Sequence, residues 1–192
     1  MRRISAPPPV RSPDGQLRIH IGCGEINSPE FVNVDALPYP HVHYVRNNIM
    51  DLDMFEDGTA DLVYMCHVLE HVARRDLHGV LKELHRVLRS EGVLRISVPD
   101  FDLLVDMYRA SGSDVSAIAD PLLGSHANPY DVHYAVFNAQ YLTKLFKDAG
   151  FSSVREWLPE ACQNHDFDDW ASRKIVRDGR EFPVSLNLEA VK

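Results

Sequence analysis

Histidine and carboxylate side chains recur at spacings that could support acid–base chemistry or metal binding. The run HVLEH at 67–71 places two histidines beside a glutamate, and the segment SHANPYDVHYAVF at 125–137 adds further histidines and tyrosines. Histidine suits proton transfer because its pKa lies near the pH at which enzymes work. The candidates for a general base are His67, His71, His126 and His133, with Tyr130 and Tyr134 nearby. Of these, we predict His133, His71 and Tyr130 as the catalytic residues.

The HVLEH run also matches H-x-x-E-H, a pattern found in zinc peptidases. On a helix both histidines would lie on one face, with the glutamate beside them as a general base. A third ligand would come from a later helix, where Glu83 and Glu91 are the nearest candidates. However, His67 directly follows the apolar run 62–66, which places it at a strand end rather than inside a helix. We therefore predict no metal site and keep a zinc hydrolase as an alternative.

The polar residues are interleaved with short apolar runs that predict a sheet. Strands are expected at 17–21, 31–34, 42–45, 62–66, 93–98, 154–158 and 184–191. Helices are expected at 75–89, 102–109 and 138–150, where apolar residues recur at helical spacing. The last run alternates apolar and polar residues, as an antiparallel strand does. Together these elements predict an α/β fold with a mostly parallel sheet, an antiparallel last strand and helices on both faces.

Ligands of such sheets bind beyond the carboxyl ends of the strands, so the residues that follow each strand are the candidate site. They are the loop 22–25, Asp35, Asp51, the segment 66–71 and the pair 99–100. Gly22 and Gly24 lack a Cβ atom, so the backbone there can approach a ligand closely and adopt positive φ.

Several segments around these strand ends, taken in order, resemble the class I S-adenosylmethionine-dependent methyltransferases, especially short type-11-like members. The segments are LRIHIGCGEIN, VNVDA, NNIMDLD, DGTADLVYMCHVLEHV, LKELHRVLRSEGVLRISVPD and LTKLFKDAGF. The resemblance covers residues 17–100 well and 138–192 more loosely. It implies a Rossmann-like methyltransferase sheet, S-adenosylmethionine as the cofactor, and a small-molecule acceptor such as a sugar or another metabolite.

The resemblance also implies cofactor contacts. Backbone N–H groups of the glycine loop would meet the methionine carboxylate, and Asp35 would accept hydrogen bonds from both ribose hydroxyls. Asp51 would accept from the adenine amino group, with the Leu52 backbone beside it. The predicted cofactor-binding set is Gly22, Cys23, Gly24, Asp35, Ala36, Asp51, Leu52, Cys66 and His67, of which the last two would lie under the methionine arm.

One departure from the family concerns the connection between the first two strands. Only residues 22–30 separate them, and Pro29 lies within this segment. A crossover between parallel strands normally needs a dozen residues or more, so we expect the usual first helix to be missing. One face of the sheet would then lose its cover, and we hypothesise that a second subunit of a homodimer or the leader covers it. The short spacing from Gly24 to Asp35 also disfavours a nicotinamide enzyme, for which about 20 residues are usual.

Length and composition set the remaining expectations. The 192 residues suit one domain, with 1–16 as a flexible proline-rich leader and 17–192 as the folded unit, in which 111–137 forms an acceptor-binding cap. The net charge of −8 disfavours nucleic acid as a partner. The three cysteines contain no C-x-x-C pair, and no apolar stretch is long enough to span a bilayer. We therefore expect a cytoplasmic methyltransferase, with a non-catalytic cofactor- or partner-binding domain of the same fold as the alternative.

Overall fold

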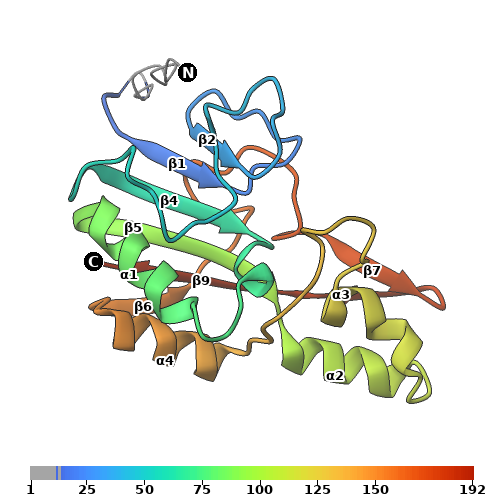
Figure 1. The fold of residues 1–192 in the computed structure, drawn as a ribbon. Helices are drawn as coiled ribbons and strands as arrows, with labels where there is room; N and C mark the ends of the chain where they lie inside the picture. Colours follow the sequence, from blue (N-terminus) through green and yellow to red (C-terminus); the bar gives the residue numbers. More distant parts are fainter. Residues whose placement is uncertain (1–11, 13) are drawn as a thin grey trace.

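A seven-stranded sheet forms the centre of the molecule (Figure 1). The computed structural model describes residue 12 and residues 14–192, so most of the predicted leader lies outside the described residues. The strands are β1 (Arg18–Ile21), β2 (Val32–Asp35), β3 (Tyr44–Val45), β4 (Ala60–Cys66), β5 (Leu88–Pro99), β6 (Ser153–Glu156) and β9 (Ser185–Val191). Their order is β3-β2-β1-β4-β5-β9-β6, and β9 runs antiparallel to both of its neighbours while the other pairs are parallel. The predicted α/β class with an antiparallel last strand is confirmed.

The register of the central strands brings their carboxyl ends to one edge. Ile21 at the end of β1 pairs with Val34 of β2 on one side and with Met65 of β4 on the other. These strands are buried along almost their whole length because both of their faces are covered, as in other parallel sheets. The loops that follow β1, β2 and β4 therefore meet above the same edge, where the sequence predicts the site.

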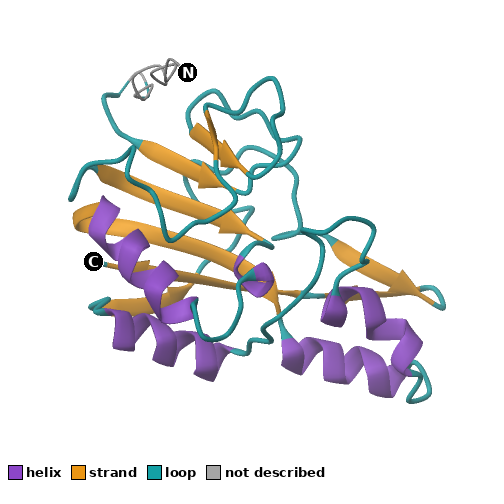
Figure 2. Ribbon diagram, viewed as in Figure 1, coloured by secondary structure: helices purple, strands orange, loops and turns teal. Residues whose placement is uncertain are grey.

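The helices are short, and they begin and end at recognisable signals. They are η1 (Leu69–His71), α1 (Leu77–Val87), α2 (Phe101–Ala110), η2 (Val115–Ile118), α3 (Ala119–Leu123) and α4 (Ala139–Ala149). At the start of α4 the Asn138 side chain accepts a hydrogen bond from the Tyr141 N–H, and Gly150 ends the helix in the left-handed conformation. Figure 2 shows α1 and α4 packed against the same face of the sheet, which they cover with their leucines and with Phe146.

The second face is covered differently from the expectation. Between β1 and β2 the described chain forms turns and loop, so the predicted absence of a helix is confirmed. The prediction of helices on both faces fails here, because an irregular segment at 157–171 packs on this face. It brings Trp157 and Phe167 against Phe31 and Tyr64. Part of this face is therefore covered by the same chain, in which the Ser12 hydroxyl also donates to the Glu30 carbonyl. The hypothesis that a second subunit or the leader covers it stays a prediction.

A third group of elements lies beyond the carboxyl ends of the strands. The hairpin of β7 (Lys174–Arg177) and β8 (Arg180–Pro183) packs with α2 and η2 around a small core that includes Leu104, Met107 and Phe182 (Figure 1). The segment 111–137, predicted as a cap, forms η2, α3 and the loop that follows them. Within the described part of the chain, no helix has the length and apolar character that crossing a membrane would require.

Candidate functional site

Two adjoining cavities lie above the carboxyl edge of the sheet. The first, which we call the β2-side cavity, has a volume of about 290 Å³. It is lined by Ile21, Gly22, Asp35, Ala36, Arg46, Asn47, Ile49, His67, Val68, His71, Val72, Pro129, Tyr130 and Tyr134. The second, the hairpin-side cavity, has a volume of about 620 Å³. It is lined by Cys66, His67, His71, Asp120, Pro121, Ser125, Asp131, His133, Trp170, Lys174, Ile175, Val176, Arg177 and Val184. His67 and His71 belong to both linings, so the two cavities share a wall.

The glycine loop after β1 is shaped by close packing. Gly22 has φ of 68°, and a Cβ atom at this position would collide with the Val68 Cγ2 atom. A glycine is therefore required there for both conformational and steric reasons. The loop N–H groups are already paired, because those of Gly22 and Cys23 donate to the Val34 carbonyl and that of Gly24 donates to Asp35. These three N–H groups thus have partners within the chain, and the expectation that N–H groups of this loop meet the methionine carboxylate stays a prediction.

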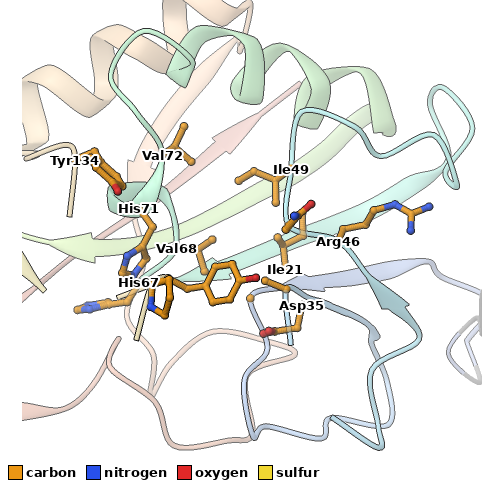
Figure 3. A pocket seen from close by; sticks show the side chains of 14 residues that line it. Ile21, Asp35, Arg46, Ile49, His67, Val68, His71, Val72 and Tyr134 are labelled. Atoms are coloured by element: carbon orange, nitrogen blue, oxygen red, sulfur yellow. The ribbon is translucent and has the colours of Figure 1, made fainter. Parts of the chain in front are cut away.

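Asp35 stands at the end of β2 with its carboxylate at the cavity (Figure 3). Its Oδ2 atom accepts from the Gly24 N–H at 2.8 Å, and its Oδ1 atom accepts from the Leu37 N–H at 2.8 Å. These bonds fix the orientation of the carboxylate. Each oxygen keeps a further lone pair, because an ionised carboxylate offers about four acceptor sites. Asp35 can therefore receive two more donors, such as a pair of vicinal hydroxyls.

The segment NNIMDLD contributes to the β2-side cavity through different residues from those predicted. Asn47 and Ile49 line the cavity, whereas Asp51 is exposed and lies outside both linings. Leu52 is fully buried in the core, and its N–H donates to Glu83 Oε1 at 3.0 Å, so this backbone group is not free for a ligand. The segment thus borders the cavity through Asn47 and Ile49. The predicted adenine contacts of Asp51 and Leu52 stay a prediction.

His67 follows β4 in a strained backbone conformation with φ of 52°, which is uncommon for a residue other than glycine. Its Nε2 atom lies 2.8 Å from Ser185 Oγ. The Ser185 hydroxyl donates its only proton to the Trp170 carbonyl at 2.6 Å, so His67 Nε2 must be the donor to Ser185. Burial, assisted by the nearby His133, lowers the pKa of His67 to about 3. The ring is therefore neutral, and its Nδ1 atom carries a lone pair.

Glu70 is a buried carboxyl group, only 1% exposed, in the short helix η1. Neither of its carboxylate oxygens has a hydrogen-bond partner. Burial raises its pKa to about 8. The Glu70 backbone carbonyl accepts from the N–H groups of Tyr134 and Ala135, which joins η1 to the loop 124–137. Sequence reasoning did not assign Glu70 a site role outside the zinc alternative, because glutamate is almost never fully buried.

His71 and His133 are brought together, as the prediction of a shared catalytic role requires. Their ring centroids lie 4.8 Å apart with an edge-to-face geometry. The His71 Nδ1 atom lies 3.1 Å from the Val132 carbonyl, which can only accept, so this nitrogen carries the proton. Burial lowers the pKa of His133, and the adjacent His71 adds to this effect. Tyr130, the third predicted catalytic residue, lines only the β2-side cavity.

The remaining predicted residues have mixed placements. Gly22, Asp35, Ala36 and His67 line the β2-side cavity, and Cys66 lines the other one. Cys23 is buried. Gly24 lies outside both linings but donates a hydrogen bond to Asp35, which lines the β2-side cavity. His126 is exposed and also lies outside both linings. Trp170, Lys174 and Arg177 of the hairpin-side cavity were not predicted as site residues.

Comparison with known proteins identifies the fold. Residues 20–96 match the methyltransferase domain family. The chain is 17% identical to a SAM-dependent methyltransferase from Archaeoglobus fulgidus, with a TM-score of 0.59 over 93% of this chain and 87% of that one. A Burkholderia thailandensis 1,6-didemethyltoxoflavin-N1-methyltransferase, with bound 1,6-didemethyltoxoflavin and S-adenosylhomocysteine, gives 18% identity and a TM-score of 0.57 over 92% and 71%.

A third similar structure is the Haloferax volcanii complex of a methyltransferase with the Trm112 methyltransferase activator. It gives 15% identity and a TM-score of 0.55 over 95% of this chain and 83% of that one. No curated protein sequence matches the chain significantly.

The strand order, with cavities at the carboxyl edge, defines a Rossmann-like methyltransferase fold. Within this fold, residues 20–96 match the methyltransferase domain family, and the similar solved structures include SAM-dependent methyltransferases. S-adenosylmethionine is the methyl donor of this family. The zinc-hydrolase alternative is accordingly set aside.

Proposed function

We propose that this methyltransferase acts on an oxygen of a small hydroxylated metabolite, such as a sugar, held in the hairpin-side cavity. The observation that carries the proposal is the wall of His67 and His71 shared by the two cavities. A cofactor in one cavity and an acceptor in the other would meet at that wall. Positioning of this kind is the main task of the protein, because the cofactor brings a methyl group already activated on a sulfonium.

The β2-side cavity suits the adenosine part of the cofactor. Asp35 offers two free acceptor positions to the ribose hydroxyls, and Ile21 and Ile49 supply apolar surface for the adenine ring. Asn47 supplies an amide that can both donate and accept. From the predicted set we therefore retain Gly22, Asp35, Ala36, Cys66 and His67 as cofactor contacts, and we add Asn47 and Ile49.

The hairpin-side cavity suits a small polar acceptor. Its volume of about 620 Å³ lies in the range of small-molecule sites. Asp120 and Asp131 provide carboxylates that accept hydrogen bonds from hydroxyl groups, and Trp170 provides an aromatic surface beside them. The Burkholderia relative acts on a small molecule, which agrees with this size class.

A hydroxyl acceptor must lose a proton, so a base belongs in this cavity. His133 lines it, and burial keeps the ring neutral at physiological pH by lowering its pKa. Tyr130 lies on the cofactor side of the shared wall. We therefore assign the base to the His71–His133 pair and give Tyr130 a contact with the bound molecules rather than a proton-transfer role.

The first test is thermal unfolding with S-adenosylmethionine and with S-adenosylhomocysteine. A ligand at 100 times its Kd adds about 2.7 kcal/mol, a rise of roughly 5–10 °C in Tm for a chain of this size. We expect this rise in the native chain and in Asp51→Ala, whose side chain lies outside the cavities. Asp35→Ala should lose it. A rise retained in Asp35→Ala would contradict the assignment of the ribose contact.

The second test is turnover with a panel of hydroxylated and amine acceptors, followed through release of S-adenosylhomocysteine. Turnover with hydroxylated acceptors, abolished in Trp170→Ala without loss of the cofactor-induced Tm rise, supports the proposal. Cofactor binding with no turnover of any acceptor would favour the alternative, a non-catalytic domain of the same fold.

A further inference from the structure

We propose that Glu70, His71 and His133 together bind one divalent transition-metal cation at the wall between the two cavities. The proposal deepens the proposed function, on which its catalytic role rests, because the cation would hold the acceptor oxygen and would activate it in place of the base assigned to the His71–His133 pair. The sequence predicted no metal site, and the zinc alternative took His67 and His71 as ligands with Glu70 as the general base. In the structure Glu83 pairs with Arg86, so it is not available as the third ligand of that alternative.

The three side chains converge closely enough for a single ion. Each offers one ligand atom, and these atoms all lie within 4.8 Å of one another. The residues come from two separate parts of the chain, η1 and the loop 124–137. The loop is fastened to η1 by the two hydrogen bonds to the Glu70 carbonyl. The convergence is therefore built into the local fold.

The Glu70 carboxylate is the strongest indication of a missing partner. It is 1% exposed, and both of its oxygens lack a hydrogen bond. Buried carboxylates are normally paired with a cation or hydrogen-bonded, because an isolated one is costly to bury. Among the described residues no lysine or arginine forms an ion pair with it, and the His67 ring, 3.6 Å away, is the one ionisable side chain paired with it. A cation at this position would satisfy both oxygens.

The two histidines are oriented as metal ligands usually are. A ligating histidine commonly donates its other ring N–H to a backbone carbonyl, which fixes the ring and directs the free nitrogen to the metal. His71 donates from Nδ1 to the Val132 carbonyl, so its Nε2 lone pair remains available. The His133 ring meets the His71 ring edge to face with 4.8 Å between the centroids, and its ligand atom lies within 4.8 Å of those of His71 and Glu70.

His67 adds a further donor. Its Nε2 proton is committed to Ser185, so the lone pair of its Nδ1 atom faces Glu70 Oε1 at 3.6 Å. The two atoms face each other at a distance too long for a hydrogen bond between them. A cation that replaces the Glu70 proton would lie near this lone pair.

Two imidazoles and a carboxylate are the protein ligands of catalytic zinc sites with an open coordination position, and they also suit iron(II). His71 reaches both cavities, so an open position would face the acceptor. Coordination lowers the pKa of a hydroxyl group, and its proton passes to solvent. The acceptor oxygen then forms the O–CH₃ bond while the S–CH₃ bond breaks and leaves its electron pair on sulfur.

The test is calorimetric titration of the full chain with Zn²⁺ after treatment with EDTA. We expect one ion per chain in the native protein and in His78→Gln, a control that changes an exposed histidine on α1. Glu70→Gln and His133→Gln should each weaken metal binding by more than about 100-fold. Mutation of a residue that only supports a metal ligand already weakens metal binding by about 10–100-fold. Unfolding curves of the metal-free proteins show whether each variant is folded.

Absence of stoichiometric binding by the native chain, tested with Zn²⁺ and then Fe²⁺, would overturn the proposal. Unchanged binding in a folded Glu70→Gln would do the same. The cofactor-induced rise in Tm, measured on the same samples, separates this proposal from the proposed function. If the cofactor raises Tm but no metal binds, only the cation proposal is contradicted. If metal binds but the cofactor does not raise Tm, the assigned cofactor site is contradicted instead.

Discussion

His20 of β1 stacks on Phe167, with 5.4 Å between the ring centroids and 13° between the ring planes. The two residues are far apart in sequence, and the contact joins the first strand to the segment 157–171. This segment covers the sheet face from which the connection between β1 and β2 has lost its helix. Aromatic packing therefore replaces a helix as the cover of that face.

Phe167→Ala tests this cover. The ring packs on His20, Phe31 and Tyr64, so its removal leaves a cavity beside the sheet. We expect a loss of about 2–3 kcal/mol in the free energy of unfolding, below the upper values for phenylalanine because the side chain is partly exposed. Urea denaturation measures the loss, with the exposed Leu158→Ala as the matched control. Equal stability of the two variants would show that the segment is not a structural cover.

The buried His20 makes stability depend on pH. Burial lowers its pKa to about 4 in the folded chain, an effect that Asp169 partly offsets and His165 reinforces, whereas about 6.5 applies to the unfolded chain. Below pH 6.5 the unfolded state binds a proton that the folded state does not. The free energy of unfolding therefore decreases as the pH is lowered, until about pH 4. Between pH 7 and pH 5 this amounts to roughly 2 kcal/mol.

His20→Phe should flatten this dependence. The variant keeps an aromatic ring and removes the titrating group, so its slope of unfolding free energy against pH between 5 and 7 should be shallower than that of the native chain. The slope is compared rather than the absolute stability, because the larger ring changes packing. An unchanged slope would assign the acid sensitivity to other histidines.

Gly22→Ala should damage both stability and cofactor binding. The new methyl group would collide with Val68, and its residue would have to hold φ of 68°. We expect a loss of about 1–3 kcal/mol, the cost of a strained backbone, together with loss of the cofactor-induced rise in Tm. Gly24→Ala is the matched control, since its φ is 54° but its Cβ atom would meet open space. If both variants behave alike, strain rather than the collision is responsible.

Glu83 joins α1 to the segment beside the β2-side cavity. Its carboxylate accepts from the Leu52 N–H and pairs with Arg86. Glu83→Gln keeps the shape but loses the charge, and we expect a loss of about 1–2 kcal/mol, typical of hydrogen bonds to charged groups. Differential scanning calorimetry at neutral pH checks this value. A Tm equal to that of the native chain would show that water replaces the pair without loss.

The sequence predicts best where local pattern and burial agree. The apolar runs that contain Ile19 and Met65 are buried on both faces in the structure, so their reading as central strands was reliable. Asn138 and Gly150 mark the ends of α4 because capping is a local property of the chain. The missing helix after β1 followed from length alone, since the residues between Gly22 and Phe31 are too few to form one.

The hairpin of β7 and β8 was missed although its turn is recognisable. Asp178 and Gly179 both have positive φ, and this dipeptide favours a two-residue hairpin turn. The flanking strands lack strong alternation because both are largely exposed, so they left no pattern of burial in the sequence.

The convergence of Glu70, His71 and His133 could not be predicted from the sequence for a different reason. Glu70 is buried because the loop 124–137 folds back over η1, a tertiary event with no local signature. The pairing of His71 with His133 depends on the same event. Composition and spacing identify residues that can bind a metal ion. Which of these residues lie close together depends on how the loop 124–137 folds.

The position of β9 determines when the sheet can be completed. β6 joins the sheet through β9, which lies between it and β5. Because chains are made from the N-terminus, β9 emerges after both of its neighbours, and until then the edge of β5 is open to pairing with other chains. Non-local pairing of this kind slows folding. The nascent protein therefore passes through a stage in which its central strands are formed but β6 is not yet joined to them. This is the stage at which protection by a chaperone would matter most.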